Sequence, residues 1–502
     1  MNLCHPLERA ASERPDALAI RYPSGQITYK TLLETVQRLA RGLHRAGLGS
    51  RDRIVVMLPN IPHFVIAYHA ILRIGGIVVP ADPSLRGHEL ALLLEEVEAS
   101  GLIIWGARFA EVRRSLQQIP TVRFIAMLGG EETEGVTSLT KLISKNQPLI
   151  ESVELDEDEP ALYQPCAGST CRPKAAELSH GALVGNAIAC RDLLGIKEDD
   201  VLLAALPLAH PIGQTLLMNL AIVSGATLSL YPKFDVEFAA SVLKRGEGTV
   251  FVSLPTMLRQ LCDYYAGEEI GEFKSARLTI CGGGKLTEDT LKDFERKFGS
   301  YVLECYTQNE TGPVCSLNQW RNGRRVGSLG HPLPGVDMKV LGSDGEEAAI
   351  GQEGEIAVKG INVTQGYLGR PLLTSSRFHD GWFLTGDLGR MDINGFFYLT
   401  GRIEGRLVRG GYAIHASEVE DVLLSHPEVA DAVVLPLPDS IVCDEIKACV
   451  VLKRGAGVST EQLAHFCSDR LADYKIPDII RFYRDLPRDA EGKINSRELV
   501  GS

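Results

Sequence analysis

The sequence lacks a bilayer-spanning stretch, a secretory signal and a paired cysteine motif. An uncharged run extends from 201 to 231, but Pro207 and Pro211 interrupt it, and the remaining piece 212–223 is too short to span a membrane. The amino terminus shows no apolar stretch behind a basic start, so no secretory signal is expected. The eleven cysteines contain no C-x-x-C spacing, which predicts reduced thiols in a cytoplasmic protein without a zinc site.

The charge balance excludes a further class of partner. The chain carries a formal net charge of -12, and nucleic-acid binding needs a surplus of Lys and Arg to neutralise phosphates. We therefore expect no nucleic-acid partner, although a single nucleotide could still bind in a local pocket. The sequence contains no H-E-x-x-H motif, so a metal held by protein side chains alone is not expected.

What the sequence does contain is a regular alternation of strand and helix patterns. Apolar runs such as RIVVMLPN (from 53) and VLLAALPL (from 201) alternate with helical patterns such as 28–47 and 286–299. Nearly continuous apolar strands between helices predict an α/β fold with parallel sheets covered on both faces. The pattern changes to short, glycine-rich strands from about 324 to 401, and a compact α+β unit is expected after it.

A loop rich in Gly, Ser and Thr lies within YQPCAGSTCRPKAAELSH, residues 163 to 180. Backbone N–H groups and hydroxyls of such a loop can face phosphate, and Lys174 could supply a positive charge. Pro173 stands where a Walker A loop has its second glycine, so the segment is not a Walker A loop. A polar surface loop fits the same residues, and both interpretations stay open.

Two further segments could surround a nucleotide. In ECYTQNETG (304 to 312), Tyr306 could stack on a purine and Glu310 could bind magnesium through carboxylate oxygens. The glycine triplet in CGGGKL (281 to 286) has no side chains, so a flat ring can approach the backbone closely. A capping turn with a buried tyrosine and an ordinary glycine turn are the respective alternatives.

His210 ends a strand-like run and precedes the apolar segment 212–223. A single histidine in this position is commonly structural, but it could also line a pocket for an acyl or aromatic group. The apolar segment favours a fatty or aromatic acid as the bound group, and helix packing alone would explain the same composition.

The carboxyl-terminal part carries the most informative residues. GWFLTGDLGRMDINGFFYLTGR (381 to 402) contains Asp387 and Arg402 on either side of a turn-rich hairpin, and LPRDAEGKINSREL (486 to 499) contains Lys493 in a glycine-flanked loop. A carboxylate for two ribose hydroxyls, an arginine and a lysine on a loop suit the activation of an acid by ATP. A hairpin-turn aspartate and a solvated lysine are the alternatives for the separate residues.

Taken in order, these segments resemble the AMP-forming adenylating superfamily of acyl-CoA synthetases, adenylation domains and luciferases, and most of all an acyl-CoA synthetase. The resemblance covers essentially the whole chain. It implies two half-reactions, in which a carboxylate attacks the α-phosphorus of ATP with release of pyrophosphate and the acyl group then passes to the thiol of coenzyme A. It also implies an amino-terminal domain over 1–402, made of two αβαβα sheet subdomains (about 1–155 and 156–323) and a β-barrel-like subdomain (324–402), followed by a small mobile α+β domain (403–502).

The resemblance implies a role for each motif residue. The expected ATP contacts are Gly168, Ser169, Thr170, Lys174, Gly283, Tyr306, Thr307, Asn309, Asp387, Tyr398 and Arg402. The expected catalytic residues are Lys493, which would bridge the carboxylate and the α-phosphate, together with Glu310, Lys174 and His210. Glu310 would also bind Mg²⁺, Glu404 would act as the hinge, and Gly411 would contact coenzyme A.

The sequence also departs from the family pattern. Cys171 and Ala175 replace the last two glycines of the phosphate loop, and Thr307 and Asn309 stand where the family has Gly and Thr. Losing one positioned hydrogen-bond donor costs about 10²–10³ in rate, against total enzymatic accelerations of about 10⁶–10¹⁷. We therefore expect an active or partly active enzyme. An adenylation enzyme that loads a separate carrier protein and a nucleotide-binding pseudoenzyme are the alternatives, and a homodimer stays open.

Overall fold

The computed structural model describes residues 2–499 apart from 84, 86, 117–118, 132, 150, 167–173, 233, 266–275, 285, 320–322, 404–405, 410–411, 438–444, 472–474, 489–493 and 496–497. Only the backbone is described at 88, 402, 406–409, 412–415, 417–418 and 436–437. The chain forms two compact units, and each is described by itself. Unit 1 comprises Met1–Met338 and Val358–Phe383, and unit 2 comprises Lys339–Ala357 and Leu384–Ser502.

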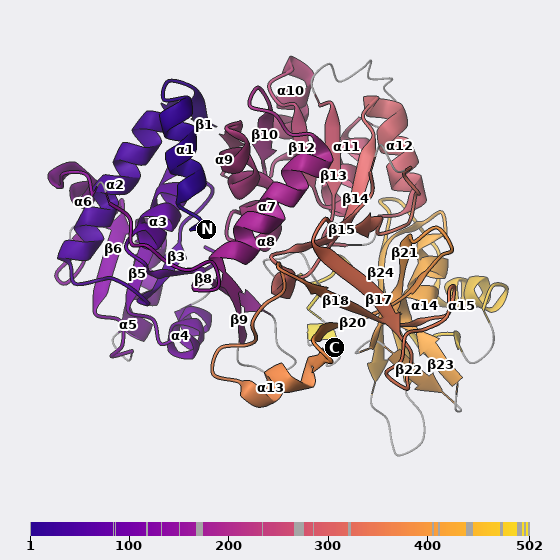
Figure 1. Ribbon diagram of the computed structural model, residues 1–502. Coiled ribbons are helices and arrows are strands. Elements are labelled where there is room, and N and C mark those ends of the chain that lie inside the picture. The colour runs from indigo at the N-terminus through magenta and orange to yellow at the C-terminus, as the bar shows by residue number, and fades with distance from the viewer. Residues whose placement is uncertain are drawn as a thin grey trace. The chain divides into compact units, whose positions relative to one another are not determined.

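The first sheet of unit 1 has seven strands in the order β7-β6-β5-β3-β4-β8-β9 (Figure 1). All neighbouring strands are parallel except β8 and β9, which form an antiparallel pair. The elements in chain order are β3 (Arg53–Met57), α3 (Pro62–Arg73), β4 (Ile77–Pro80), α4 (Gly87–Glu96), β5 (Gly101–Trp105), α5 (Gly106–Leu116), β6 (Phe124–Leu128), β7 (Thr137–Ser138), α6 (Leu139–Lys145), β8 (Pro160–Cys166) and β9 (Lys174–Ser179). The strand predicted from residue 53 is thereby confirmed.

The second sheet has nine strands in the order β16-β15-β14-β13-β12-β10-β11-β1-β2. Its strands are β1 (Leu18–Tyr22), β2 (Gly25–Thr28), β10 (Val201–Ala204), β11 (Thr227–Leu230), β12 (Val250–Ser253), β13 (Leu278–Cys281), β14 (Val302–Thr307), β15 (Val314–Leu317) and β16 (His331–Pro332). The amino-terminal strand β1 pairs in parallel with β11, and the strand predicted from residue 201 is β10.

Helices precede and separate these strands. They are α1 (His5–Glu13), α2 (Tyr29–Arg45), α7 (His180–Leu194), α8 (Pro211–Gly213), the π-helix η1 (Gln214–Asn219), α9 (Leu220–Ser224), α10 (Val236–Arg245), α11 (Pro255–Tyr264) and α12 (Glu288–Phe298). The helices predicted over 28–47 and 286–299 correspond to α2 and α12. At the start of α2 the side chain of Thr28 accepts a hydrogen bond from the N–H of Thr31, which satisfies one of the open backbone donors of the helix.

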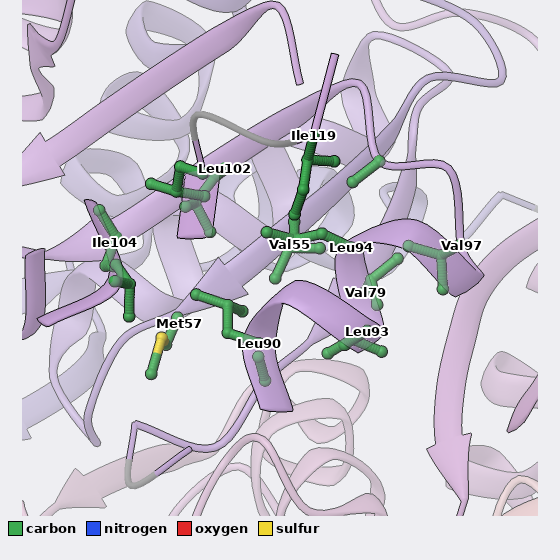
Figure 2. Packing of buried hydrophobic residues seen from close by; sticks show 14 of the residues in the cluster. Val55, Met57, Val79, Leu90, Leu93, Leu94, Val97, Leu102, Ile104 and Ile119 are labelled. Atoms are coloured by element: carbon green, nitrogen blue, oxygen red, sulfur yellow. The ribbon is translucent and has the colours of Figure 1, made fainter. Parts of the chain in front are cut away.

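The core of the seven-stranded sheet shows why these residues form layers. Val55 of β3, Val79 of β4 and Leu102 of β5 are fully buried in one cluster with Leu90 and Leu94 of α4 (Figure 2). The apolar residues of α4 recur at the three- and four-residue spacing that gives a helix one apolar face. Burying each such side chain contributes about 1.5–3 kcal/mol, so strands that are apolar on both faces require helices on both sides.

The carboxyl-terminal part is richer in antiparallel strands. A five-stranded sheet has the order β17-β18-β20-β19 with β21 paired to β20, and smaller sheets are β22-β23 and β24-β25-β26. These strands and the nearby helices are β17 (Val336–Leu341), β18 (Gly354–Gly360), α13 (Pro371–Ser376), β19 (Phe378–His379), β20 (Trp382–Met391), β21 (Phe397–Arg402), β22 (Arg406–Arg409), β23 (Tyr412–His415), α14 (Ala416–Leu424), β24 (Val429–Leu437), β25 (Glu445–Leu452), α15 (Thr460–Ser468) and β26 (Ile479–Tyr483). Val419 and Leu463 join α14 and α15 to the core of the three-stranded sheet.

Two further properties concern the described helices and cysteines. No helix among them combines the length and the apolar content needed to cross a membrane. Each of the nine described cysteines is buried, and none forms a disulfide with another described cysteine. Burial raises the pKa of Cys305 to about 12, so this thiol is protonated and poorly nucleophilic near neutral pH.

Candidate active site

Three polar side chains from distant parts of the chain meet in unit 1: Lys174, Glu310 and Tyr367. The Nζ atom of Lys174 lies 3.4 Å from Oε1 of Glu310 and donates a hydrogen bond of 3.1 Å to the hydroxyl of Tyr367. That hydroxyl in turn donates to the same Oε1 over 2.7 Å. Nζ also lies 4.3 Å from the centroid of the Tyr367 ring, within the range of a cation–π interaction. An ammonium, a phenol and a carboxylate therefore form a closed triangle of contacts.

Short backbone elements position these three residues. Lys174 is the first residue of β9, directly after the expected phosphate loop. Glu310 lies in η2 (Asn309–Thr311), a 3₁₀ turn that follows β14. Tyr367 is joined to β9 by an isolated antiparallel bridge with Ala176. The ends of two sheets thus supply Lys174 and Glu310, and a separate loop supplies the tyrosine.

A short segment before the tyrosine fastens the Glu310 turn to β9. The N–H of Thr364 donates to the backbone carbonyl of Glu310 over 2.7 Å. The hydroxyl of the same threonine donates to the carbonyl of Glu177 in β9, also over 2.7 Å. The side-chain amide of Asn362 donates to the carbonyl of Thr311 over 2.6 Å. These contacts fix the backbone of Glu310 relative to Lys174.

The triangle is shielded from water. The side chains of Lys174 and Glu310 are 12% and 10% exposed, so their attraction is stronger than that of a surface pair. Burial, and next the charge and hydrogen bond of Glu310, raise the pKa of the Tyr367 hydroxyl well above its usual range. The phenol therefore stays protonated and donates to the carboxylate. Such an arrangement can present one positive charge and one carboxylate to a ligand that carries phosphates.

Whether a magnesium ion fits this site depends on the carboxylate of Glu310. Among the described residues, no group of three or more His, Cys, Asp or Glu side chains could hold a metal. Mg²⁺ commonly binds through one or two carboxylates and completes its shell with water and substrate phosphates. A single carboxylate beside an ammonium matches that pattern. The residues present therefore fit a cation that arrives with a nucleotide.

The residues expected near adenine lie at the end of β14. Tyr306 is 5% exposed, and its hydroxyl accepts a hydrogen bond of 2.9 Å from Nε2 of Gln308. Thr307 is the last residue of this strand. Asn309 donates from Nδ2 to the carbonyl of Pro165 in β8 over 3.4 Å. The Asn309 side chain thus connects the Glu310 turn to the strand that leads into the expected phosphate loop.

Gly283 and His210 both approach the apolar segment 212–223. Gly283 has φ of 76°, and a Cβ there would lie 3.0 Å from Leu254 and 3.1 Å from Ile212. Both the backbone conformation and the lack of space therefore favour glycine. His210 caps α8, because its Nδ1 atom accepts a hydrogen bond of 3.2 Å from the N–H of Ile212. His210 thus has the structural role considered from the sequence, and its catalytic role stays a prediction.

Asp387 lies in unit 2, on the hairpin of β20 and β21. It pairs in register with Arg402, of which only the backbone is described, and this confirms the predicted hairpin. Asp387 is 2% exposed, and its N–H donates to the hydroxyl of Thr385 over 3.1 Å. Tyr398 of the same hairpin donates from its hydroxyl to Asp392 over 3.1 Å. The hairpin therefore holds a buried carboxylate in a well-defined backbone frame.

Several predicted residues lie outside the described part of the chain. They are Gly168, Ser169, Thr170, Glu404, Gly411 and Lys493. Their proposed contacts with phosphate, the hinge, coenzyme A and the reacting carboxylate stay predictions from the resemblance.

Sequence reasoning missed Tyr367. The residue stands in TQGYLGRP (364 to 371), which has no acidic residue and none of the motifs named above. Locally, the sequence offers only the Gly-Tyr pair as a sign of an unusual backbone at this point. In the structure Gly366 has φ of 143°. The partners of Tyr367 are 193 and 57 residues away, so only the folded chain reveals its place beside Lys174 and Glu310.

The chain is similar to known proteins over nearly its whole length. Residues 7–368 match the family described as AMP-binding enzyme, and residues 418–493 match the AMP-binding enzyme C-terminal domain. The chain is similar to a long-chain-fatty-acid–CoA ligase of Bacillus subtilis, at 31% identity over 98% of this chain and 93% of that protein. It is similar to a 2-succinylbenzoate–CoA ligase of Bacillus cereus, at 30% identity over 97% and 95%. The structure of ATP-bound MatB from Rhodopseudomonas palustris matches it with a TM-score of 0.90, 28% identity and coverage of 100% and 98%.

Proposed function

Because the chain belongs to the AMP-binding enzyme family, we propose that it is an ATP-dependent ligase that joins a carboxylic acid to the thiol of coenzyme A. A carboxylate oxygen attacks the α-phosphorus of ATP, and the bond from that phosphorus to the bridging oxygen of pyrophosphate breaks. The thiol sulfur then attacks the acyl carbon, and AMP leaves. The observation that carries the proposal is the buried triangle of Lys174, Glu310 and Tyr367.

Charge explains the part that the triangle plays. Displacement of pyrophosphate moves negative charge onto the leaving oxygens, and positioned cations stabilise that charge most effectively in a site without water. In this proposal Lys174 contacts these oxygens, and Glu310 holds a cation beside them. Mg²⁺ bound there with ATP would neutralise charge on the phosphates. We assign Asp387 to the ribose hydroxyls and Lys493 to the α-phosphate.

The apolar segment 212–223 supports a fatty or aromatic acid. Ile212 is 1% exposed, contacts the position of Gly283 and donates its N–H to His210. Gly283, which is assigned to adenine, is thus next to the apolar segment. The two CoA ligases compared above act on long-chain fatty acids and on 2-succinylbenzoate. The buried cysteines support a location in the reducing cytoplasm.

Exchange of labelled pyrophosphate into ATP tests the proposal. We expect exchange with at least one acid from a panel of short, long and aromatic acids, and formation of its thioester when coenzyme A is added. Loading of a pantetheinylated carrier protein without acyl-CoA formation would identify an adenylation enzyme instead. Tight ATP binding by calorimetry with no exchange for any acid would identify a nucleotide-binding pseudoenzyme and overturn the proposal.

A further inference from the structure

Tyr367 is the neutral member of the triangle, and its hydroxyl contacts both charged members, Lys174 and Glu310. Its hydroxyl accepts from Lys174 over 3.1 Å and donates to Oε1 of Glu310 over 2.7 Å. An O–H···O⁻ distance of this length is typical of a hydrogen bond strengthened by charge. Tyr367 itself is 4% exposed, so water cannot readily replace its hydroxyl.

We propose that Tyr367 is a positioning residue, whose hydroxyl holds Oε1 of Glu310 and thereby directs the second carboxylate oxygen toward the cation that accompanies ATP. The proposal rests on the function proposed above. Among the described residues, Oε2 of Glu310 accepts no hydrogen bond from the protein, whereas Oε1 has two partners. The protein thus holds the carboxylate through Oε1 and leaves Oε2 for the cation.

The need for such a residue follows from the two roles that Lys174 has in this proposal. In the triangle the ammonium neutralises Glu310, yet the same ammonium must contact phosphate oxygens when ATP binds. A buried carboxylate that loses its cationic partner is costly unless other hydrogen bonds remain. Tyr367 retains its hydrogen bond to Oε1 while the lysine changes partners. The carboxylate therefore stays in place to bind the cation.

The backbone around Tyr367 supports this role. The bridge between Tyr367 and Ala176 ties the tyrosine to β9, the strand that begins with Lys174. The hydrogen bond from Thr364 to the carbonyl of Glu310 ties the same loop to the Glu310 turn. The loop is therefore fixed to both elements whose side chains it must align, as expected of a group that orients a metal ligand.

The test compares Tyr367→Phe with the wild type. The substitution removes the hydroxyl but keeps the ring below Lys174. Loss of a group that orients a metal ligand typically costs about 10–100-fold in metal affinity or activity. We therefore expect the Mg²⁺ concentration for half-maximal pyrophosphate exchange to rise by that factor. The Mg²⁺ dependence of ATP binding, followed by calorimetry without any acid, should shift in the same way.

Tyr29→Phe is the matched control. Tyr29 is fully buried, and its hydroxyl donates to the carbonyl of Ala226 over 2.6 Å. Its loss should lower Tm but leave the Mg²⁺ dependence unchanged. In a Glu310→Gln background, Tyr367→Phe should cause no further change in Mg²⁺ dependence, because the group it orients is gone.

The outcomes separate this inference from the proposed function. A Tyr367→Phe protein that responds to Mg²⁺ as the wild type does would overturn the positioning role. A wild type that binds ATP with Mg²⁺ but exchanges no pyrophosphate would overturn the proposed function, and the calorimetric comparison would still decide the role of Tyr367. If the variant is too unstable for calorimetry, the Mg²⁺-dependent rise of Tm with ATP gives the same comparison. A wild type without Mg²⁺-dependent ATP binding overturns both.

Discussion

Glu310 and Asp387 are both buried carboxylates, but the protein holds them by different means. Glu310 takes its partners from Lys174 and Tyr367, which are 136 and 57 residues away. Asp387 lies in a hairpin, where it pairs in register with Arg402 and its backbone N–H donates to the hydroxyl of Thr385. A carboxylate on a local hairpin has its backbone frame as soon as the two strands pair. Glu310 is placed only when three separate segments have packed.

The largest effect is expected from Glu310→Gln, which removes the carboxylate built from long-range contacts. The amide keeps the shape, but Lys174 loses its counter-charge and the cation loses its ligand. We expect kcat/KM for ATP in pyrophosphate exchange to fall by about 10²–10³-fold, the size of effect seen when a positioned electrostatic group is lost. Glu198→Gln is the matched control, because Glu198 forms an exposed ion pair with Arg14. A wild-type rate in Glu310→Gln would make Glu310 merely structural.

Asp387→Asn should have a smaller effect, mainly on the binding of ATP. A hydrogen bond to a charged group contributes about 1.5–3 kcal/mol, so KM for ATP should rise by about 10–100-fold. Nucleotide analogues sharpen the comparison, because 2′,3′-dideoxy-ATP lacks the hydroxyls assigned to Asp387. Wild type and variant should bind this analogue equally well. An equal loss of affinity for both nucleotides would mean that Asp387 supports the hairpin and does not contact ribose.

His69 in α3 is a buried titratable group without the hydrogen-bond partners that Glu310 has. It is 1% exposed, and neither ring nitrogen has a hydrogen-bond partner among the described residues. Burial lowers its pKa to about 4, so the unfolded chain binds the proton first as the pH falls below the ordinary histidine value. The ring centroids of Tyr68 and His69 lie 5.5 Å apart, and the thiol of Cys4 contacts the backbone carbonyl of His69.

We expect the contribution of His69 to stability to be full above about pH 6.5 and to decrease by about 1.4 kcal/mol per pH unit below it, until the pH reaches the folded pKa. Tm measured between these values should fall less steeply in His69→Leu than in the wild type. Part of the slope should remain, because the pKa of His180 is also lowered to about 4, chiefly by burial. Replacing the exposed His44 by leucine should leave the slope unchanged, and an unchanged slope in His69→Leu would contradict the argument.

The smallest effect is expected from a purely local contact in unit 2. Ser459 caps α15 by accepting from the N–H of Gln462 over 3.3 Å, and its own N–H donates to the Gln462 side chain over 2.8 Å. Ser459→Ala should destabilise this helix by about 1 kcal/mol, measured by hydrogen exchange of its amides. Ser468→Ala at the other end of the helix is the control, because its hydroxyl bonds only a carbonyl three residues earlier. Equal exchange in both variants would show that the cap is not needed.

These contrasts explain which features could be predicted from the sequence. The strands from 53 and 201, the helices and the Asp387 hairpin depend on local periodicity and turn residues, and the structure confirms them. The family and the α/β fold are also confirmed. The pairing of β1 with β11 joins residues about two hundred positions apart, and no local pattern encodes it. The contact of Tyr367 with Glu310 escaped prediction for the same reason.

The division of the chain into units has a practical consequence for recombinant work. The chain passes from one unit to the other after Met338, Ala357 and Phe383, so no single cut releases either unit whole. A fragment that stops at Phe383 would retain Lys339–Ala357 but lose most of β20, the neighbour of β18. Strand β18, without its neighbour β20, would expose unpaired backbone N–H and C=O groups, and such edges cause aggregation. Domain exchange between relatives therefore needs matched junctions at all three crossings.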